Sequence, residues 1–390
     1  MSAEPFERYA KTQTQLARRA SVSLSLLSKV ECGDRTATHA LIASVARALH
    51  VPIERLTGQP YADTPHDTAT HNAIDALRSV LRRIDLPEDA PPRSLEQLAA
   101  DVNTLAALRR DANYRSLSVR LPATLDDLAR AAHHVDSEAV PLVQRMFVTA
   151  YYAAHMMLHR LGFLDLAEVV ERKLADAARE ADDPLTEILA QWVRAQSFQS
   201  AGDYAHGLKL MDTARTQFAD VLRHDSSPAA LTVYGNLHLR SITLASRAGD
   251  LDTTRAHIAE ARNLAARLGS SDQVHYGLTF GPANLATHET AAFVELGDAA
   301  AALRAAEKWR PPRSMPRTRK GHHFIGVARA HLRRGDREAA LAALQQARRG
   351  APQQTRLHPM VRDAVAVLVN LHHRSNPELT NYAGWVGITR

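Results

Sequence analysis

Cysteine is nearly absent from this sequence: Cys32 is the only one among 390 residues, which excludes a framework of disulfides. Aromatic residues make up 5% of the chain, and no apolar run is long enough to span a bilayer. The N-terminus also lacks the basic and then apolar pattern of a secretion signal. The low aromatic share, together with frequent alanine and leucine, favours helices over strands. The single cysteine and the missing membrane and secretion signals favour a cytoplasmic protein with no membrane partner.

Residues 12–35 carry the pattern of two short helices around a tight turn. Thr12 and Gln15 match a capping box for the first helix, and Ser23 matches the cap of the second. The turn is expected at Ala20-Ser21-Val22, with Ser21 at a positive φ. The side chains expected to face inward are Leu16, Ala17, Val22, Leu27 and Val30. A crossing this tight would project the second helix outward, where it can enter a DNA major groove.

The motif Thr-Gln-x-x-Leu-Ala, Val-Ser, Leu-Ser-x-Val-Glu-x-Gly in residues 12–33 resembles the Xre family of phage-repressor-type helix-turn-helix proteins. The resemblance implies a DNA-binding domain in residues 1–58, where eight basic residues outnumber five acidic ones. It implies that double-stranded DNA is contacted by Gln13, Ser23, Leu24, Ser25, Ser28, Lys29 and Arg35. Glu31 is expected to pair with Arg18 or Arg19. Only Pro5–Ala10 remain for the first helix, so we expect a clipped domain or a true start upstream.

A second pattern repeats over about residues 140–350. Five turn glycines each separate two helical segments: Gly162, Gly202, Gly249, Gly297 and Gly335. Five residues after each glycine stands a small side chain or none, which lets helices approach closely: Ala167, Gly207, Thr254, Ala302 and Ala340. The pattern resembles the tetratricopeptide family of helical solenoid repeats, in a divergent form. An irregular helical bundle is the alternative.

These patterns predict an all-α chain with an N-terminal helix-turn-helix domain and a tetratricopeptide-like solenoid in residues 137–390, closed by capping helices that include Met360–His372. Residues 59–70 are the predicted linker, and residues 71–136 are a helical connecting segment. Within that segment we expect helices at His71–Ile84 and Ser94–Leu108, and a third after Leu121-Pro122. No strand pattern stands out.

In such a solenoid the first helix of each pair lines a concave groove. Projection from the turn glycines gives the candidate effector-binding residues Tyr152, His159, Trp192, Gln196, Gln199, Asn236, Thr243, Arg247, Asn284 and Arg329. Asn236 and Asn284 hold equivalent places, where their carboxamides are expected to bond the main chain of an extended peptide. An ordinary solvated helix face is the alternative reading of these positions.

Xre-type domains joined to tetratricopeptide repeats resemble the peptide-pheromone receptors of Gram-positive bacteria and a set of actinobacterial regulators. The resemblance implies a transcription regulator, expected to be a homodimer, whose repeats sense a peptide or small-molecule effector. The alternative is a protein-interaction scaffold whose clipped N-terminal domain no longer binds DNA. No motif indicates an enzyme or a cofactor. His155 and His159 lack a third metal ligand nearby. The basic segment 309–323 is predicted to be a solvated loop between repeats, with contact to phosphate as the alternative.

Overall fold

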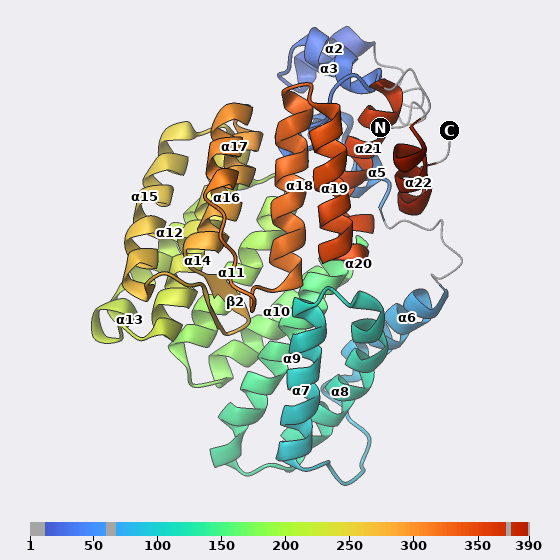
Figure 1. The fold of residues 1–390 in the computed structure, drawn as a ribbon. Coiled ribbons are helices and arrows are strands. Elements are labelled where there is room, and N and C mark those ends of the chain that lie inside the picture. Colours follow the sequence, from blue (N-terminus) through green and yellow to red (C-terminus); the bar gives the residue numbers. More distant parts are fainter. Residues whose placement is uncertain (1–11, 60–67, 372–375, 389–390) are drawn as a thin grey trace.

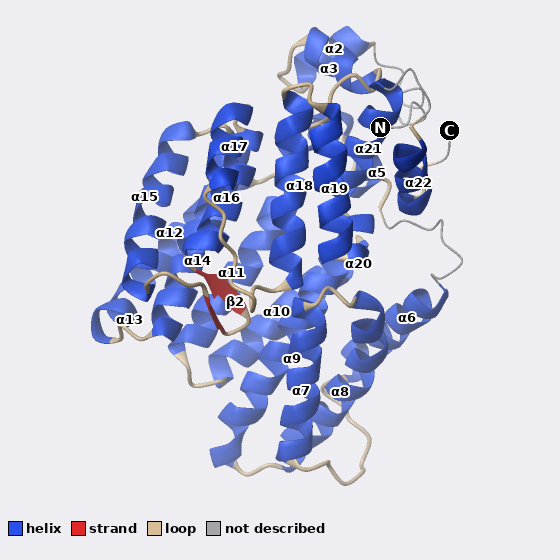
Figure 2. Cartoon of the chain, viewed as in Figure 1, coloured by secondary structure: helices blue, strands red, loops and turns tan. Residues whose placement is uncertain are grey.

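The computed structural model describes residues 12–59, 68–371 and 376–388. Within these ranges the chain forms 21 α-helices, one 3-10 helix and one two-stranded hairpin (Figures 1 and 2). The predicted helical class is therefore confirmed, with the hairpin as an exception. Among the described helices none is both long and apolar enough to cross a membrane. The helix predicted within Pro5–Ala10 lies outside the described residues.

Four short helices open the described chain: α2 (Gln13–Arg19), α3 (Leu24–Glu31), α4 (His39–Leu49) and α5 (Ile53–Thr57). The predicted capping box is present, because the Thr12 hydroxyl accepts from the Gln15 N–H at 3.3 Å and the Gln15 side chain accepts from the Thr12 N–H. Ser21 takes a φ of 54° in the turn, and the Ser23 hydroxyl caps α3. Of the five side chains expected inside, four are buried and Val22 is half-buried.

The next helices are α6 (Thr68–Arg83), α7 (Leu95–Arg110) and α8 (Tyr114–His134), then the 3-10 helix η1 (Ser137–Ala139) and α9 (Val140–Leu161). Helices α6 and α7 pack on α8, and α7 and α8 pack on α9. Two predicted boundaries are wrong here. Helix α6 begins within the predicted linker 59–70, of which residues 60–67 lie outside the described ranges. Helix α8 begins well before Pro122 and carries this proline internally, because Leu117, Leu121 and Leu125 form one continuous buried face.

From α9 onward the helices form packed pairs joined by short turns. The pairs are α9 with α10 (Leu164–Glu180), α11 (Pro184–Ala201) with α12 (Tyr204–Gln217), α14 (Pro228–Ala248) with α15 (Leu251–Leu268), α16 (Pro282–Glu295) with α17 (Ala299–Glu307), and α18 (Arg317–Arg333) with α19 (Arg337–Gly350). Helix α13 (Ala219–His224) lies between the second and third pairs. Each pair turns at one of the five predicted glycines, whose φ values lie between 72° and 88°.

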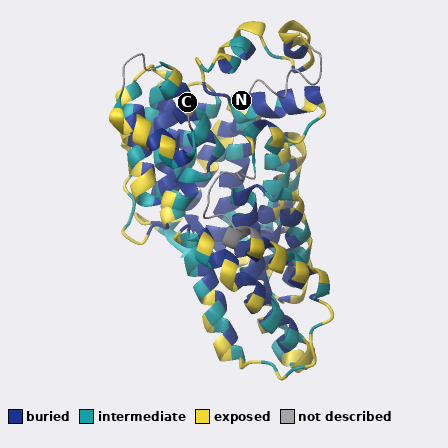
Figure 3. Ribbon diagram, turned by 90° about the vertical axis from the view of Figure 1, so that its right-hand side faces the viewer, coloured by how far each residue is buried: buried dark blue, intermediate teal, exposed yellow. Residues whose placement is uncertain are grey.

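The small residues that follow the turn glycines are all buried, as the predicted close approach of the helices requires. The first helices of the pairs contact one another in chain order, and we call this set, α9, α11, α14, α16 and α18, the inner layer. Figure 3 shows the helices buried on the sides that face their neighbours and exposed on their outer sides.

A β-hairpin, which the sequence did not reveal, packs against the inner layer. Its strands are β1 (Gln273–His275) and β2 (Leu278–Phe280), joined at Tyr276-Gly277, where both residues have positive φ. Asn236 and Asn284 both donate to the Thr279 carbonyl, at 3.1 and 2.7 Å. The expectation that these two carboxamides bond an external peptide is therefore corrected, because the extended segment that they hold belongs to the chain itself.

The N-terminal helices are not separate from the rest of the described chain. The last helices are α20 (Pro352–Arg356), α21 (Pro359–Leu371), close to the predicted bounds, and α22 (Pro377–Val386). One hydrophobic cluster joins side chains of α2, α4 and α5, such as Leu49 and Leu56, to Leu344 of α19 and Tyr382 of α22. In Figure 1 the N-terminal helices accordingly lie at the end of α18 and α19, beside α21.

Gly202→Ala tests this packing, with Gly249→Ala as its matched control. Both glycines have positive φ, so each substitution costs about 1 kcal/mol of backbone strain. A Cβ at residue 202 would lie 2.4 Å from the Cβ of Ala43 in α4, whereas a Cβ at residue 249 meets nothing within 4 Å. We expect Gly202→Ala alone to speed hydrogen exchange in α4 and α5. Equal exchange in the two variants would contradict this packing.

Candidate functional site

The side chains that the Xre resemblance assigns to DNA lie on the outer side of α2 and α3. The exposed ones are Gln13, Ser23, Leu24, Ser25, Lys29 and Arg35, and Ser28 is half-buried. Leu24 is 43% exposed, which is unusual for a large apolar side chain in this structure. The amide of Gln13 donates to Glu31, a partner that the sequence did not suggest.

The expected pairing of Glu31 with Arg18 or Arg19 is wrong. Glu31 ends α3 and meets the first residue of α2, whereas Arg18 and Arg19 stand in the last turn of α2. Arg19 instead contacts the ring of His50, with 3.2 Å between the nitrogen atoms. On the outer side of α3 the exposed residues are therefore Leu24, Ser25 and Lys29.

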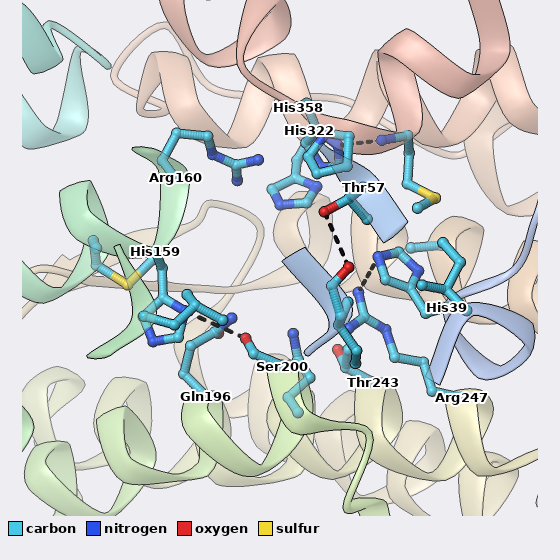
Figure 4. Close-up of a pocket in the computed structure, with 18 of the residues that line it drawn as sticks. His39, Thr57, His159, Arg160, Gln196, Ser200, Thr243, Arg247, His322 and His358 are labelled. Carbon is cyan, nitrogen blue, oxygen red and sulfur yellow. Dashed lines mark hydrogen bonds between the residues drawn. The ribbon is translucent and has the colours of Figure 1, made fainter. Parts of the chain in front are cut away.

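A cavity of about 230 Å³ lies between the inner layer and the N-terminal helices (Figure 4). All five inner-layer helices contribute side chains to its wall, and α4, α5 and the start of α21 close it. Six of the ten candidate groove residues line this cavity: His159, Trp192, Gln196, Gln199, Thr243 and Arg247. An adjoining hollow between α4, α5 and α9–α11 shares His159, Ser200 and Glu54 with it.

The other four candidates lie elsewhere, which corrects the predicted groove. Asn236 and Asn284 are buried under the hairpin. The ring of Tyr152 is covered by the guanidinium of Arg109, 4.2 Å from the ring centroid, and Arg109 donates to the Gly277 carbonyl. Arg329 is buried beside a smaller cavity of about 50 Å³. The helical offsets identified the correct face, but the hairpin and α4 cover parts of it.

Three arginines and three histidines that the sequence analysis did not single out complete the cavity wall: Arg160, Arg240, Arg319, His39, His288 and His358. The prediction of a solvated loop over residues 309–323 is wrong from Arg317 onward. Met315 is buried and anchors the segment, α18 begins at Arg317, and Arg319 and His322 then face the cavity. Arg240, Thr243 and Arg247 are three and four residues apart and so share one helix face. The spacing that predicted Thr243 and Arg247 therefore also predicts that Arg240 lines the cavity.

Arg240 lies against neutral partners on α11. Its Nη1 donates to the Oε1 atoms of Gln196 and Gln199, at 2.6 and 2.7 Å. Its guanidinium carbon lies 4.0 Å from the ring centroid of Trp192, which provides a cation–π contact. Burial, with the charges of Arg319 and Arg247 nearby, lowers the pKa of Arg240 to about 9.

Burial also lowers the pKa of the histidines around the cavity, and neighbouring arginines lower it further. The pKa of His288 falls to about 3 and that of His39 to about 4. The pKa values of His159, His322 and His358 fall well below the ordinary value. These rings are therefore neutral at pH 7, and the charged groups of the wall are four arginines and Glu54.

A buried carboxylate beside the cavity ties three helices together. Glu295, at the end of α16, accepts from Arg329 of α18 at 2.7 Å and lies 2.9 Å from the His39 Nδ1 at the start of α4. Arg247 of α14 reaches the other ring nitrogen of His39 at 3.1 Å, as Figure 4 shows. Burial alone would raise the pKa of Glu295, but Arg329 and His39 hold it well below its usual value.

His155 and His159 lie close together, with 4.4 Å between ring centroids. The described residues contain no group of three His, Cys, Asp or Glu arranged to hold a metal ion.

A scan against protein-family models and a search of the curated proteins found no match for this chain. The function is therefore inferred from the chain's own residues.

Glu295→Gln is expected to lower the free energy of unfolding by about 3–5 kcal/mol, because it leaves Arg329 buried without a counter-charge. Glu289→Gln, on the same helix, is the control: its partner Arg262 is 56% exposed, so the expected loss is about 1 kcal/mol or less. Urea unfolding measures both. Similar losses for the two variants would show that Glu295 does not tie the helices together.

Acidification from pH 7 to pH 5.5 is expected to destabilise the protein. The unfolded chain binds protons on its histidines below about pH 6.5, whereas His288 and His39 stay neutral in the folded state. Each such histidine lowers the free energy of unfolding by roughly 1.4 kcal/mol per pH unit below that point. Asp363, whose pKa burial raises to about 6, opposes the trend, and burial raises the pKa of Glu171 and Asp272 in the same direction. Urea unfolding at the two pH values measures the slope, and a flat or rising stability would contradict it.

Proposed function

We propose that this chain is a sequence-specific DNA-binding transcription regulator with an N-terminal helix-turn-helix domain of the Xre type. The main observation behind this proposal is that α2 and α3 together have one buried side and one side exposed to solvent. Leu16, Leu27 and Val30 are buried, while the opposite side presents Leu24, Ser25 and Lys29 to solvent. An exposed leucine is suited to a thymine methyl group, and serine and lysine are suited to base edges.

The surroundings of α3 support the same function. Arg18, Arg19 and Arg35 are exposed near it and are suited to backbone phosphates. Gln13 would exchange its bond to Glu31 for a phosphate oxygen. Such domains read pseudo-palindromes as dimers, so we include a homodimer in the proposal.

The paired helices from α9 to α19 form, in this proposal, a divergent tetratricopeptide-like solenoid that receives an effector. Its inner layer lines the cavity, and α4 and α5 of the DNA-binding domain close that cavity. A ligand held there touches both parts of the chain. It would therefore change how the DNA-reading helix is held, provided that its affinity differs between two arrangements of the chain.

A second candidate is a protein-interaction scaffold that does not bind DNA. The shared hydrophobic cluster between the N-terminal helices and α18–α22 favours it, because these helices then have a structural role without DNA. The two candidates differ in one measurable property, the affinity for a specific DNA sequence over random DNA.

DNA selection from a random library, followed by fluorescence anisotropy, tests the proposal. The wild type is expected to bind its selected sequence with an affinity that falls as salt rises. Lys29→Ala is expected to weaken specific binding about 5- to 100-fold, as loss of a base contact does. Lys209→Ala, an exposed lysine on α12, is the control and should bind like the wild type.

The scaffold predicts a different result. No sequence would be enriched, and both lysine variants would bind random DNA with the affinity of the wild type. That outcome would overturn the regulator, provided that circular dichroism shows the variants to be folded.

A further inference from the structure

The cavity beneath the N-terminal helices has an unbalanced charge. Its wall contains the guanidinium groups of Arg160, Arg240, Arg247 and Arg319, and Glu54 is its one carboxylate. None of these four arginines forms an ion pair with a carboxylate within the described part of the chain. Arg240 is buried and the other three are half-buried, and charges kept from water without counter-charges are costly, so an anionic partner would stabilise this arrangement.

A counter-charge distinguishes Arg329, beside the smaller cavity, from the arginines of this wall. The Arg329 guanidinium has Glu295 at 2.7 Å, although its Nε and Nη2 atoms are also without a hydrogen-bond partner. In the cavity, the Nε atoms of Arg240 and Arg247 are buried and have no hydrogen-bond partner. Donors are therefore available in the place where positive charge accumulates.

Neutral side chains add further donors and an apolar wall. His159 has a buried Nε2 atom with no partner, and its other ring nitrogen lies 3.3 Å from the Ser200 hydroxyl. Trp192, Met156 and Ile42 contribute apolar surface to the same wall. The lining thus suits a molecule with charged groups and a carbon skeleton, rather than a bare ion.

The shape of the site argues against a peptide. This cavity, at about 230 Å³, is below the usual range for drug-sized ligands, although the adjoining hollow between α4, α5 and α9–α11 adds about 500 Å³. Asn236 and Asn284, the carboxamides suited to an extended main chain, are already occupied by β2.

We propose that the cavity binds a small organic anion carrying at least two negative charges, held by Arg240, Arg247 and Arg319. Carboxylates and phosphates share this chemistry. In the proposed regulator this anion is the effector. Binding of the anion to the cavity needs no DNA, so only its regulatory role rests on the proposed function.

Thermal unfolding of the full chain with two probes distinguishes the sources: citrate for carboxylates and glycerol 3-phosphate for phosphates. Sodium chloride at matched ionic strength is the blank. At least one probe at about 10 mM is expected to raise the Tm by about 3 °C or more above the blank. No rise with either probe would overturn the proposal.

Arg319→Gln should abolish this rise, because it removes one of the three cations. Arg317→Gln, an exposed arginine on the same helix, is the matched control and should keep the rise. Equal rises in the two variants would show that the probes bind elsewhere, which overturns the assignment to the cavity.

Gln196→Glu provides a second test that does not remove an arginine. The substitution is nearly isosteric and places a carboxylate 2.6 Å from Arg240, where a neutral oxygen now accepts. It is expected to raise the Tm of the free protein and to reduce the response to the probes. A lower Tm together with an unchanged response would contradict the proposal.

The DNA experiment separates this inference from the proposed function. Lys29→Ala should weaken specific DNA binding about 5- to 100-fold and keep the anion response. In the wild type, the absence of an anion response together with specific DNA binding refutes only the ligand class, whereas an anion response without specific DNA binding refutes only the regulator.

Discussion

The buried carboxylate of Glu295 is the interaction on which the arrangement of the chain depends. It neutralises Arg329 and binds His39, so that α16, α18 and the start of α4 meet at one point. Arg247 joins from α14 through the same imidazole. Removal of one partner would leave a buried charge unpaired in the low-dielectric interior, which costs free energy. The contact therefore holds these helices together as a unit. The N-terminal helices are thereby fixed over the inner layer.

This single carboxylate also explains the character of the cavity. Glu295 compensates the charges on its own side, while the arginines on the other side have carboxamides, an indole ring and histidines around them. The interior thus contains arginine side chains without counter-charges, between the inner layer and the N-terminal helices. If a small anion with two or more charges neutralises that charge, it strengthens the contact between the paired helices and the N-terminal helices, which in this proposal carry the DNA-reading face. In this proposal, ligand recognition and control of DNA binding follow from one electrostatic imbalance.

Much of the local structure followed from sequence patterns, because the physics behind it is local. The Thr12 capping box, the cap at Ser23 and the positive φ of Ser21 depend on residues within one turn of each other. The turn glycines and the small residues after them behave as expected for the same reason. Helical offsets then identified six of the ten groove candidates as cavity residues, since a helix presents one face to its neighbours.

The remaining features arise from contacts between segments far apart in the chain. No local pattern shows that Asn236 and Asn284 hold β2, or that Gly202 touches Ala43 of α4. The sequence by itself determined the helices, their caps and their turns, together with the pattern that resembles a DNA reader. Only the tertiary structure decided which face α4 and α5 cover and which arginines gather beneath them. Burial and charge compensation are properties of the assembled interior, and sequence spacing does not contain them.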